Sequence, residues 1–286
     1  MSNNNLSGKR LAPEDPGMKE VGIGQAAATA PMLRVSVLAL LLTGVGCTQF
    51  PEPARRSIIE GTRAYEGRQY AAAAVTLDAV IRDHPTAPES AEAFYVLALC
   101  RIRQGRLADA RSDLDRCLDL SVRPDLTARA WATRGAVEYD AGAWDRAAEM
   151  YEKALRDLPE RPPTDLVRYR CGTALQRLGR WDDARGMYAA LLHHYPDSPH
   201  AADARRRFSW NRSYFAIQCG AFASESQADA LLGKIRSVLP DTRRESEARF
   251  DRPMFLVYAG RYPTYAEAER GLPQVRKHVP GAFIVP

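Results

Sequence analysis

The stretch AWATRGAVEYDAGAWDRAAEMYEKALRDLP, residues 130–159, combines two helical patterns with small residues and a closing proline. Gly135 lies in the first half, where a residue without a side chain allows two helices to approach closely. Trp144 opens the second half, and Ala147, Tyr151 and Leu155 follow it at helical spacing. The stretch therefore predicts two helices joined by a short turn.

The same pattern recurs with a period of 37 residues. The residues aligned with Trp144 are Tyr70, Leu107 and Trp181, and alanine follows three residues later at Ala73, Ala110, Ala147 and Ala184. The large residues seven positions on are Leu77, Leu114, Tyr151 and Tyr188, and the small residues of the first halves are Gly61, Ala98, Gly135 and Gly172. Similarity at a fixed period predicts a solenoid of stacked units.

These units resemble the tetratricopeptide repeat (TPR) over roughly residues 54–197. The resemblance implies an α solenoid of four helix pairs, and the segment 198–208, opened by Ser198, would cap the last pair, so that the domain covers residues 54–208. The geometry of the family places tyrosines on the concave surface of the first helices, where they would form a groove for an extended peptide of an unidentified envelope protein. These residues are Tyr65, Tyr95, Tyr139 and Tyr169. Sideways packing of the tyrosines between helices is the alternative.

After Trp210 the hydrophobic pattern changes to a period of two. The stretch AIQCGAF, residues 216–222, alternates and then breaks at Gly220, which is typical of a half-buried strand. Strands are predicted at 214–222, within 241–252, at 254–262 and at 282–286, with helices at 224–238 and 264–279 opened by Ser224 and Thr264. The order βαββαβ predicts a small ferredoxin-like α+β domain, in which both helices cover one face of a four-stranded antiparallel sheet.

Residues 211–286 resemble the sporulation-related repeat (SPOR) domain, which binds bacterial peptidoglycan. The resemblance rests on IQCGAF, residues 217–222, and on GRY, residues 260–262, each followed by a capped helix. It implies that the open face of the sheet binds denuded glycan strands, from which the stem peptides have been removed. The family often has tryptophan or arginine on the third strand, where this sequence has Met254 and Leu256.

Alternation assigns the side chains of the strands to two faces. The residues expected to face the helices are Phe215, Ile217, Cys219, Phe255, Val257, Ala259, Phe283 and Val285. Glycan binding is expected from the solvent-facing set of Tyr214, Gln218, Met254, Leu256, Tyr258 and Ile284, accompanied by Ala216 and Ala282, on a face with almost no charge. A plain ferredoxin-like domain whose outer face contacts a protein is the alternative.

The stretch MLRVSVLALLLTGVGC, residues 32–47, resembles a bacterial lipoprotein signal with Cys47 as the lipidated residue, although Gly44 stands where the family prefers leucine. Its apolar run is too short to span a bilayer. Residues 1–31 are polar or small and are expected to be disordered, and Met32 is an alternative start. The resemblance implies a membrane-anchored protein of the bacterial cell envelope that faces the periplasm, and Thr48 favours the outer membrane. An ordinary secretory signal or a short anchor is the alternative.

Composition and motifs argue against other classes of protein. The net charge of +5 in 286 residues is mild, and the sequence lacks the basic stripe of a nucleic-acid-binding protein and the aromatic pair of an RNA-recognition domain. Cys100, Cys117 and Cys171 fall at small apolar positions of the repeats and are expected to be buried thiols, with a disulfide between two of them as the alternative. No catalytic, cofactor or metal motif is present in the sequence.

The sequence therefore predicts a non-enzymatic envelope lipoprotein that binds peptidoglycan through its C-terminal domain and a protein through its solenoid. A scaffold for the assembly of envelope or outer-membrane proteins, with the C-terminal domain as a second protein contact, is the alternative. An accessory protein of a cell-wall hydrolase is a third reading. A role in cell division and a role in general envelope maintenance are both compatible with the sequence.

Overall fold

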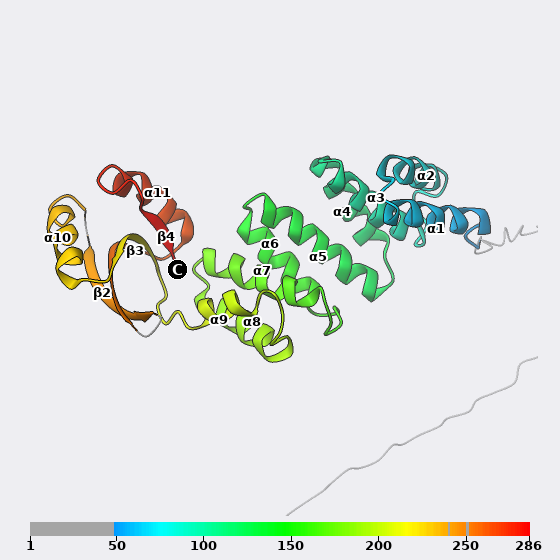
Figure 1. Cartoon of the computed structure of the whole chain (residues 1–286). Helices are drawn as coiled ribbons and strands as arrows, with labels where there is room; N and C mark the ends of the chain where they lie inside the picture. The colour runs from blue at the N-terminus through cyan, green and yellow to red at the C-terminus, as the bar shows by residue number, and fades with distance from the viewer. Residues whose placement is uncertain (1–48, 240, 250–251) are drawn as a thin grey trace, which may run out of the picture. The chain divides into compact units, whose positions relative to one another are not determined.

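The computed structural model describes residues 49–239, 241–249 and 252–286 (Figure 1). The segments predicted as a disordered region, 1–31, and as a lipoprotein signal, 32–47, lie outside the described residues, and so does Cys47. None of the helices in the described part of the chain is long and apolar enough to cross a membrane.

Residues 52–208 form consecutive helices that pair as the repeat pattern predicts (Figure 1). Their bounds are α1 (Glu52–Glu66), α2 (Tyr70–Asp83), α3 (Ser90–Arg103), α4 (Leu107–Leu120), α5 (Pro124–Asp140), α6 (Trp144–Ala154), α7 (Thr164–Arg177), α8 (Trp181–His194) and α9 (Ala201–Phe208). The second helices of the pairs begin at the four residues that the 37-residue period aligns. The predicted α solenoid is confirmed.

Each pair turns through one residue in the left-handed conformation. Gly105, Gly142 and Gly179 have φ angles of 75°, 72° and 81°, and Arg68 holds the equivalent place in the first pair with a φ of 59°. The following residue donates its N–H to a carbonyl five residues back, at distances between 2.8 and 2.9 Å, which closes the end of the first helix. Glycine is favoured here because a side chain is strained at positive φ.

The small residues of the first helices lie against the large residues of the second. A Cβ atom at Gly172 would stand 2.7 Å from Cε1 of Tyr188, and one at Gly135 would stand 2.9 Å from Cδ1 of Tyr151. Tyr188 and Tyr151 are fully buried. This close packing explains why the repeat combines a glycine with a bulky residue sixteen positions later.

A buried carboxylate joins the second and third pairs. Glu138 of α5 has no exposed surface, and it forms ion pairs with Arg111 of α4 at 2.7 Å, with Arg146 of α6 at 3.0 Å and with Arg134 from one turn earlier in α5. Arg134 also contacts Asp115 of α4 at 3.1 Å. One carboxylate thus pairs with guanidinium groups from three helices.

Asp113 of α4 is a second buried carboxylate. It is 5% exposed, and one of its oxygens lies 2.7 Å from Nη1 of Arg101, whose Nη2 contacts Asp78 at 3.2 Å. Burial raises the pKa of Asp113 to about 7, although Arg101 acts in the opposite direction. The folded state therefore binds the proton of Asp113 more tightly than the unfolded chain does.

We expect the stability that this proton contributes to be fully present below about pH 4 and to be lost as the pH rises through about 7. Asp113→Asn cannot lose a proton, so it should gain stability relative to the wild type across this window, by up to about 1.4 kcal/mol per pH unit. Urea unfolding of both proteins at several pH values measures the difference. A difference that falls with pH would show that the ion pair with Arg101 outweighs burial, and a constant difference would show that the two effects cancel.

The remaining elements form a four-stranded antiparallel sheet with two helices on one face, as the sequence predicts (Figure 1). Their bounds are β1 (Phe215–Phe222), α10 (Glu225–Ile235), β2 (Thr242–Arg249), β3 (Arg252–Tyr262), α11 (Tyr265–Arg276) and β4 (Phe283–Val285), and the strand order is β2-β3-β1-β4. Thr264 caps α11 by accepting the N–H of Glu267 at 3.3 Å.

Two other predicted helix caps are wrong in detail. Ser224 precedes α10 but bonds Ser226 at 2.8 Å instead of the helix backbone. Ser198 lies ahead of α9, where it donates to Asp165 of α7 at 2.7 Å and accepts the N–H of His200. The segment nevertheless covers the last pair, because the buried Ala201 and Ala204 of α9 join its hydrophobic cluster.

The described cysteines are free thiols. Cys100, Cys117 and Cys171 are buried in the solenoid, and Cys219 is buried between the sheet and its helices. Burial raises the pKa of each thiol, which keeps it protonated and unreactive. The prediction of buried core thiols is confirmed.

Candidate functional site: the open face of the sheet

The face of the sheet opposite the helices is defined by the pairing of β4 with β1. Ile284 lies opposite Ile217, and Phe283 lies opposite Gln218. Directly opposed residues share a face, and Ile217 belongs to the core under the helices. Ile284 therefore faces the helices, whereas Phe283 is 49% exposed on the open side.

The assignment of β4 from alternation is thus wrong in both directions. Ala282 and Ile284, expected outside, pack in the core cluster, while Phe283 and Val285, expected inside, lie on the open face. The predicted contribution of Ile284 to an open glycan surface is corrected accordingly.

Strand β2 places charge on the open face. Arg243, Glu245 and Glu247 lie opposite Tyr258, Leu256 and Met254 of β3, so they share the face of those residues. Nε of Arg243 donates to Glu245 at 2.8 Å, and the hydroxyl of Tyr258 donates to Glu247 at 3.4 Å. The expectation of a face with almost no charge is wrong.

A segment that we call the strap, residues 209–214, borders this face. Arg212 of the strap forms an ion pair with Glu245, and its guanidinium lies over the rings of Trp210 and Tyr258 at 4.9 and 5.8 Å. Nε1 of Trp210 donates to the carbonyl of Tyr214 at 3.4 Å, which holds the strap in a turn. The strap is thereby fixed to the sheet through both charge and aromatic contact.

Several residues expected in solvent are consequently covered. Leu256 has no exposed surface, Tyr258 is 1% exposed and Gln218 is 7% exposed. Tyr214 and Met254 are partly buried. Leu256 and Tyr258 form a small cluster with Ala216, packed by Tyr214 and Val285. The expectation that Gln218 and Leu256 point freely into solvent is wrong, although both lie on the predicted face.

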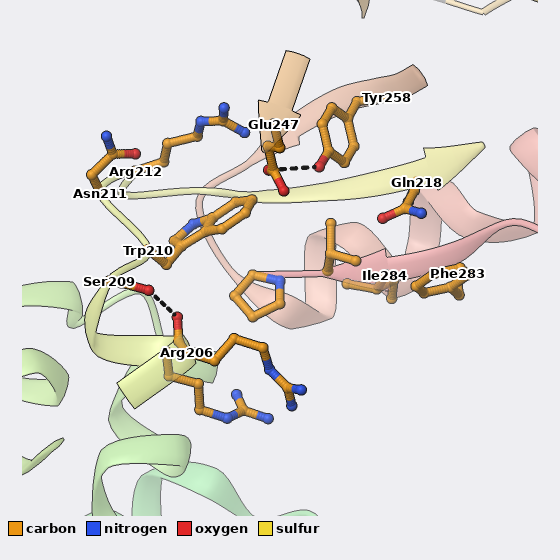
Figure 2. Close-up of a pocket in the computed structure, with 13 residues that line it drawn as sticks. Arg206, Ser209, Trp210, Asn211, Arg212, Gln218, Glu247, Tyr258, Phe283 and Ile284 are labelled. Atoms are coloured by element: carbon orange, nitrogen blue, oxygen red, sulfur yellow. Dashed lines mark hydrogen bonds between the residues drawn. The ribbon is translucent and has the colours of Figure 1, made fainter. Parts of the chain in front are cut away.

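A cavity of about 690 Å³ remains between the strap and the sheet (Figure 2). Its lining includes Trp210, Arg212, Gln218, Tyr258, Phe283 and Val285. Figure 2 shows Trp210 on one side of the cavity and Gln218 with Phe283 on the other. The last turn of α9 also borders it through Arg206 and Arg207. Aromatic, amide and guanidinium groups thus converge on one hollow.

In the solenoid, the four tyrosines predicted to form a peptide groove pack between helices. Tyr65 contacts Tyr70 with ring centroids 5.6 Å apart, and Tyr139 contacts Trp144 at 5.2 Å. These two tyrosines lie two repeats apart, and both are partly buried.

The other two tyrosines, also two repeats apart, use their hydroxyls to contact the next pair and α9, respectively. The hydroxyl of Tyr95 lies 3.5 Å from Oγ1 of Thr133, and that of Tyr169 donates to Asp203, while the ring of Tyr169 stacks on His200. The observed contacts favour the alternative of sideways packing for all four tyrosines.

Two cavities lie instead against the first helices of the pairs. One, of about 540 Å³, is lined from α1, α3 and α5 by Ile58, Ile59 and Leu126 together with charged residues such as Arg63 and Glu92. The second, of about 180 Å³, is lined mainly by α5 and α7, with Ala132, Ala136 and Leu166 among its residues. None of the four tyrosines lines either cavity.

Comparison with family models matches residues 211–286 to the SPOR domain. The C-terminal unit is a SPOR domain. Two further models, both of the tetratricopeptide repeat, match residues 89–160 and 138–208, which show TPR repeats from the second helix pair to α9. The matched range of the SPOR domain has the same bounds as the resemblance in the sequence.

The solved structures that are similar to the chain have low sequence identity to it. A TPR protein with an unusual peptide-binding site, YrrB, is 17% identical, with a TM-score of 0.47 over 54% of this chain and 74% of that chain. MamA of strain AMB-1 is 20% identical, with a TM-score of 0.44 over 55% and 79%. PilF of Pseudomonas aeruginosa is 18% identical, with a TM-score of 0.45 over 65% and 82%. A comparison with curated proteins gave no match.

The SPOR domain carries a row of arginine and aromatic side chains that the sequence did not reveal. The guanidinium of Arg243 lies 5.2 Å from the ring of Tyr214 and 5.3 Å from that of Tyr258, and Arg212 continues the row to Trp210. The charged stretch RRESE, residues 243–247, is the sequence signal for it. In the part of the chain that the structure describes, no cluster of side chains has the composition of a metal site.

Proposed function

We propose that the protein is a non-enzymatic cell-envelope lipoprotein that binds peptidoglycan glycan strands through its SPOR domain and a protein partner through its TPR solenoid. Acylation at Cys47 would hold it in the membrane, facing the periplasm and in the outer membrane where the cell has one. The observation that supports the glycan site is the cavity of about 690 Å³ between the strap and the sheet. Its volume lies in the range of known ligand sites.

The chemistry of this cavity suits a sugar chain. Sugar rings present apolar C–H faces that pack on aromatic rings, and Trp210 and Phe283 supply such rings. The amide of Gln218 both donates and accepts hydrogen bonds, as sugar hydroxyl and acetamido groups require. Phe283 is half-exposed, so a ligand that covers it would remove apolar surface from water.

The TPR solenoid offers a separate surface for the protein partner. The cavity along α1, α3 and α5 combines an apolar floor at Ile58, Ile59 and Leu126 with arginine and glutamate side chains. Ile59 is 51% exposed. An extended segment with alternating apolar and charged side chains fits this arrangement. Its apolar side chains would contact the isoleucine and leucine side chains, and its charged side chains would pair with the arginine and glutamate side chains.

Replacing Phe283 with alanine should lower the affinity for isolated cell-wall sacculi by about two- to tenfold, since an aromatic contact contributes about 0.5–1.5 kcal/mol. The melting temperature should change little, because half of the side chain is exposed. Co-sedimentation of the purified protein with sacculi measures the binding.

Val238→Ala is the matched control, because Val238 is 46% exposed and follows α10 on the other side of the domain. It should bind sacculi like the wild type. Wild-type affinity in Phe283→Ala would place the glycan elsewhere on the domain. If the wild-type protein itself does not sediment with sacculi, the alternative scaffold with a C-terminal protein contact is favoured.

A further inference from the structure

The turn of the last helix pair is in contact with the SPOR domain. Trp181, which begins α8, is only 6% exposed, whereas Leu107 at the equivalent position of the second pair is 37% exposed. The ring of Trp181 packs on that of Phe215 of β1 with centroids 4.8 Å apart, and its Nε1 donates to the carbonyl of Pro263 at 3.3 Å. The SPOR domain therefore covers Trp181.

Gly179 allows the backbone of the SPOR domain to approach this turn. A Cβ atom at Gly179 would stand 2.9 Å from the carbonyl oxygen of Pro263. Gly105 ends the first helix of the second pair with a similar φ, 75° against 81°, but a Cβ atom there would meet no other part of the described chain within 4 Å. Glycine at position 179 is therefore required by the contact between the domains as well as by its positive φ.

Arg177 of α7 forms a further contact between the domains. Its guanidinium lies 4.1 Å from the ring centroid of Tyr265 of α11 and 4.0 Å from that of Trp144 of α6. A guanidinium between two aromatic rings is attracted to both. We call the whole set the docking contact; its residues are Arg177, Gly179 and Trp181 of the solenoid and Phe215, Pro263 and Tyr265 of the SPOR domain.

The docking contact also supports two sides of the cavity. Trp210 of the strap and Ile284 of β4 both pack against the buried cluster that contains Trp181 and Phe215. Trp210 lines the cavity, and Ile284 directly follows Phe283, which lines it from the other side (Figure 2). The two aromatic rings of the proposed sugar site are thus held by the docking contact, one directly and the other through its neighbour in β4.

We propose that the last TPR pair is part of the wall-binding site: the docking contact holds Trp210 and Phe283 in the arrangement that binds glycan, and separation of the domains weakens binding. Trp181 and Gly179 are positioning residues, because neither lines the cavity. This inference rests on the proposed glycan binding and adds the solenoid to the site. A ligand that prefers the docked form also stabilises that form, so glycan binding and docking are coupled.

The test compares two glycine substitutions in the full chain by co-sedimentation with sacculi. Gly179→Ala should lower the affinity by about three- to tenfold, because its methyl group displaces Pro263 and the apparent affinity falls with the fraction of docked molecules. Gly105→Ala introduces the same backbone strain without touching the SPOR domain, so it should bind like the wild type. Circular dichroism checks that both variants are folded.

Variants of Trp181 separate its two contacts. Trp181→Phe keeps a ring against Phe215 but loses the donor to Pro263, so its affinity for sacculi should lie between those of the wild type and Trp181→Ala. Leu107→Ala truncates the equivalent residue of the second pair and should leave the affinity unchanged.

A measurement on the wild type needs no substitution. Glycan strands freed of peptide by an amidase should slow amide hydrogen exchange at residues 178–181, because bound glycan reduces the fraction of molecules in which the domains have separated. These residues do not line the cavity, so the ligand does not shield them directly.

Three results would overturn the inference while the proposed function stands. They are wild-type affinity in both Gly179→Ala and Trp181→Ala, an equal loss of affinity in Gly105→Ala and Gly179→Ala, and unchanged exchange at residues 178–181 when the wild type is saturated with glycan. The second result would assign the loss to strain in the turn instead of to docking. If the wild-type protein does not sediment with sacculi at all, the proposed function fails and this inference fails with it.

Discussion

Replacing Glu138 with alanine should lower the free energy of unfolding by about 3–5 kcal/mol, because it removes the buried carboxylate that pairs with the buried guanidinium of Arg134. The side chain of Arg134 is only 10% exposed and would retain Asp115 alone, while Arg111 and Arg146 would lose the carboxylate that they share. Urea unfolding followed by circular dichroism measures the loss. The effect should reach both the second and the third helix pairs, because the three arginines come from α4, α5 and α6.

Glu149 provides the matched control on the surface of α6. It pairs with Lys153 at 2.7 Å and is 58% exposed, so Glu149→Ala should change stability by less than about 1 kcal/mol. Glu138→Gln should fall between the two, since the amide keeps one acceptor oxygen but not the charge. If Glu138→Ala proves as mild as Glu149→Ala, the arginine cluster does not stabilise the solenoid.

The second large effect is expected at Tyr188, which fills the space beside Gly172. Tyr188→Ala should cost about 3–5 kcal/mol, because the fully buried ring leaves a cavity that the close helices cannot collapse into. Tyr188→Leu should cost less, since the second pair already places a leucine, Leu114, at the equivalent position beside Ala98. Thermal and urea unfolding measure both variants.

Trp144 serves as the comparison for Tyr188. It opens α6 at a repeat position, but it is partly exposed, with its ring against Tyr139 and under the guanidinium of Arg177. Trp144→Ala should therefore destabilise the protein less than Tyr188→Ala, despite the larger side chain. If Trp144→Ala lowers the free energy of unfolding more than Tyr188→Ala does, the packing near the turn contributes more to stability than the packing beside the glycine.

The solenoid could be predicted closely because the same sequence pattern occurs in four units. Tyr70, Leu107, Trp144 and Trp181 each begin a helix, and four copies of one spacing leave little freedom in placing the elements. The buried carboxylates could not be predicted, because Glu138 and Asp113 look like ordinary solvated residues of an amphipathic helix. Only the packing of α4, α5 and α6 brings three arginines onto one glutamate.

The sheet shows where alternation fails. The register of β1 against β3 shifts twice, between Phe215 and Ile217 and between Gln218 and Gly220. A strict alternation of side chains between the two faces therefore does not hold along the whole of β1. β4 has only three described residues, all apolar, and its faces follow from pairing with β1 instead of from its own pattern. The strap has no periodic pattern, so its place against Tyr258 is a tertiary property.

The left-handed residue that ends each first helix differs between the first pair and the other three. Three pairs use glycine there, whereas the first uses Arg68, whose φ of 59° strains the backbone by about 1–2 kcal/mol. The first pair also has a single neighbouring pair, so we expect it to separate from the array at the lowest free energy. The cavity along α1, α3 and α5 exists only while that pair is closed. A partner that binds in this cavity would bind only the closed conformation, so its apparent affinity would be lower when some molecules are open. Its binding would in turn stabilise the packing of the first pair against the rest of the array.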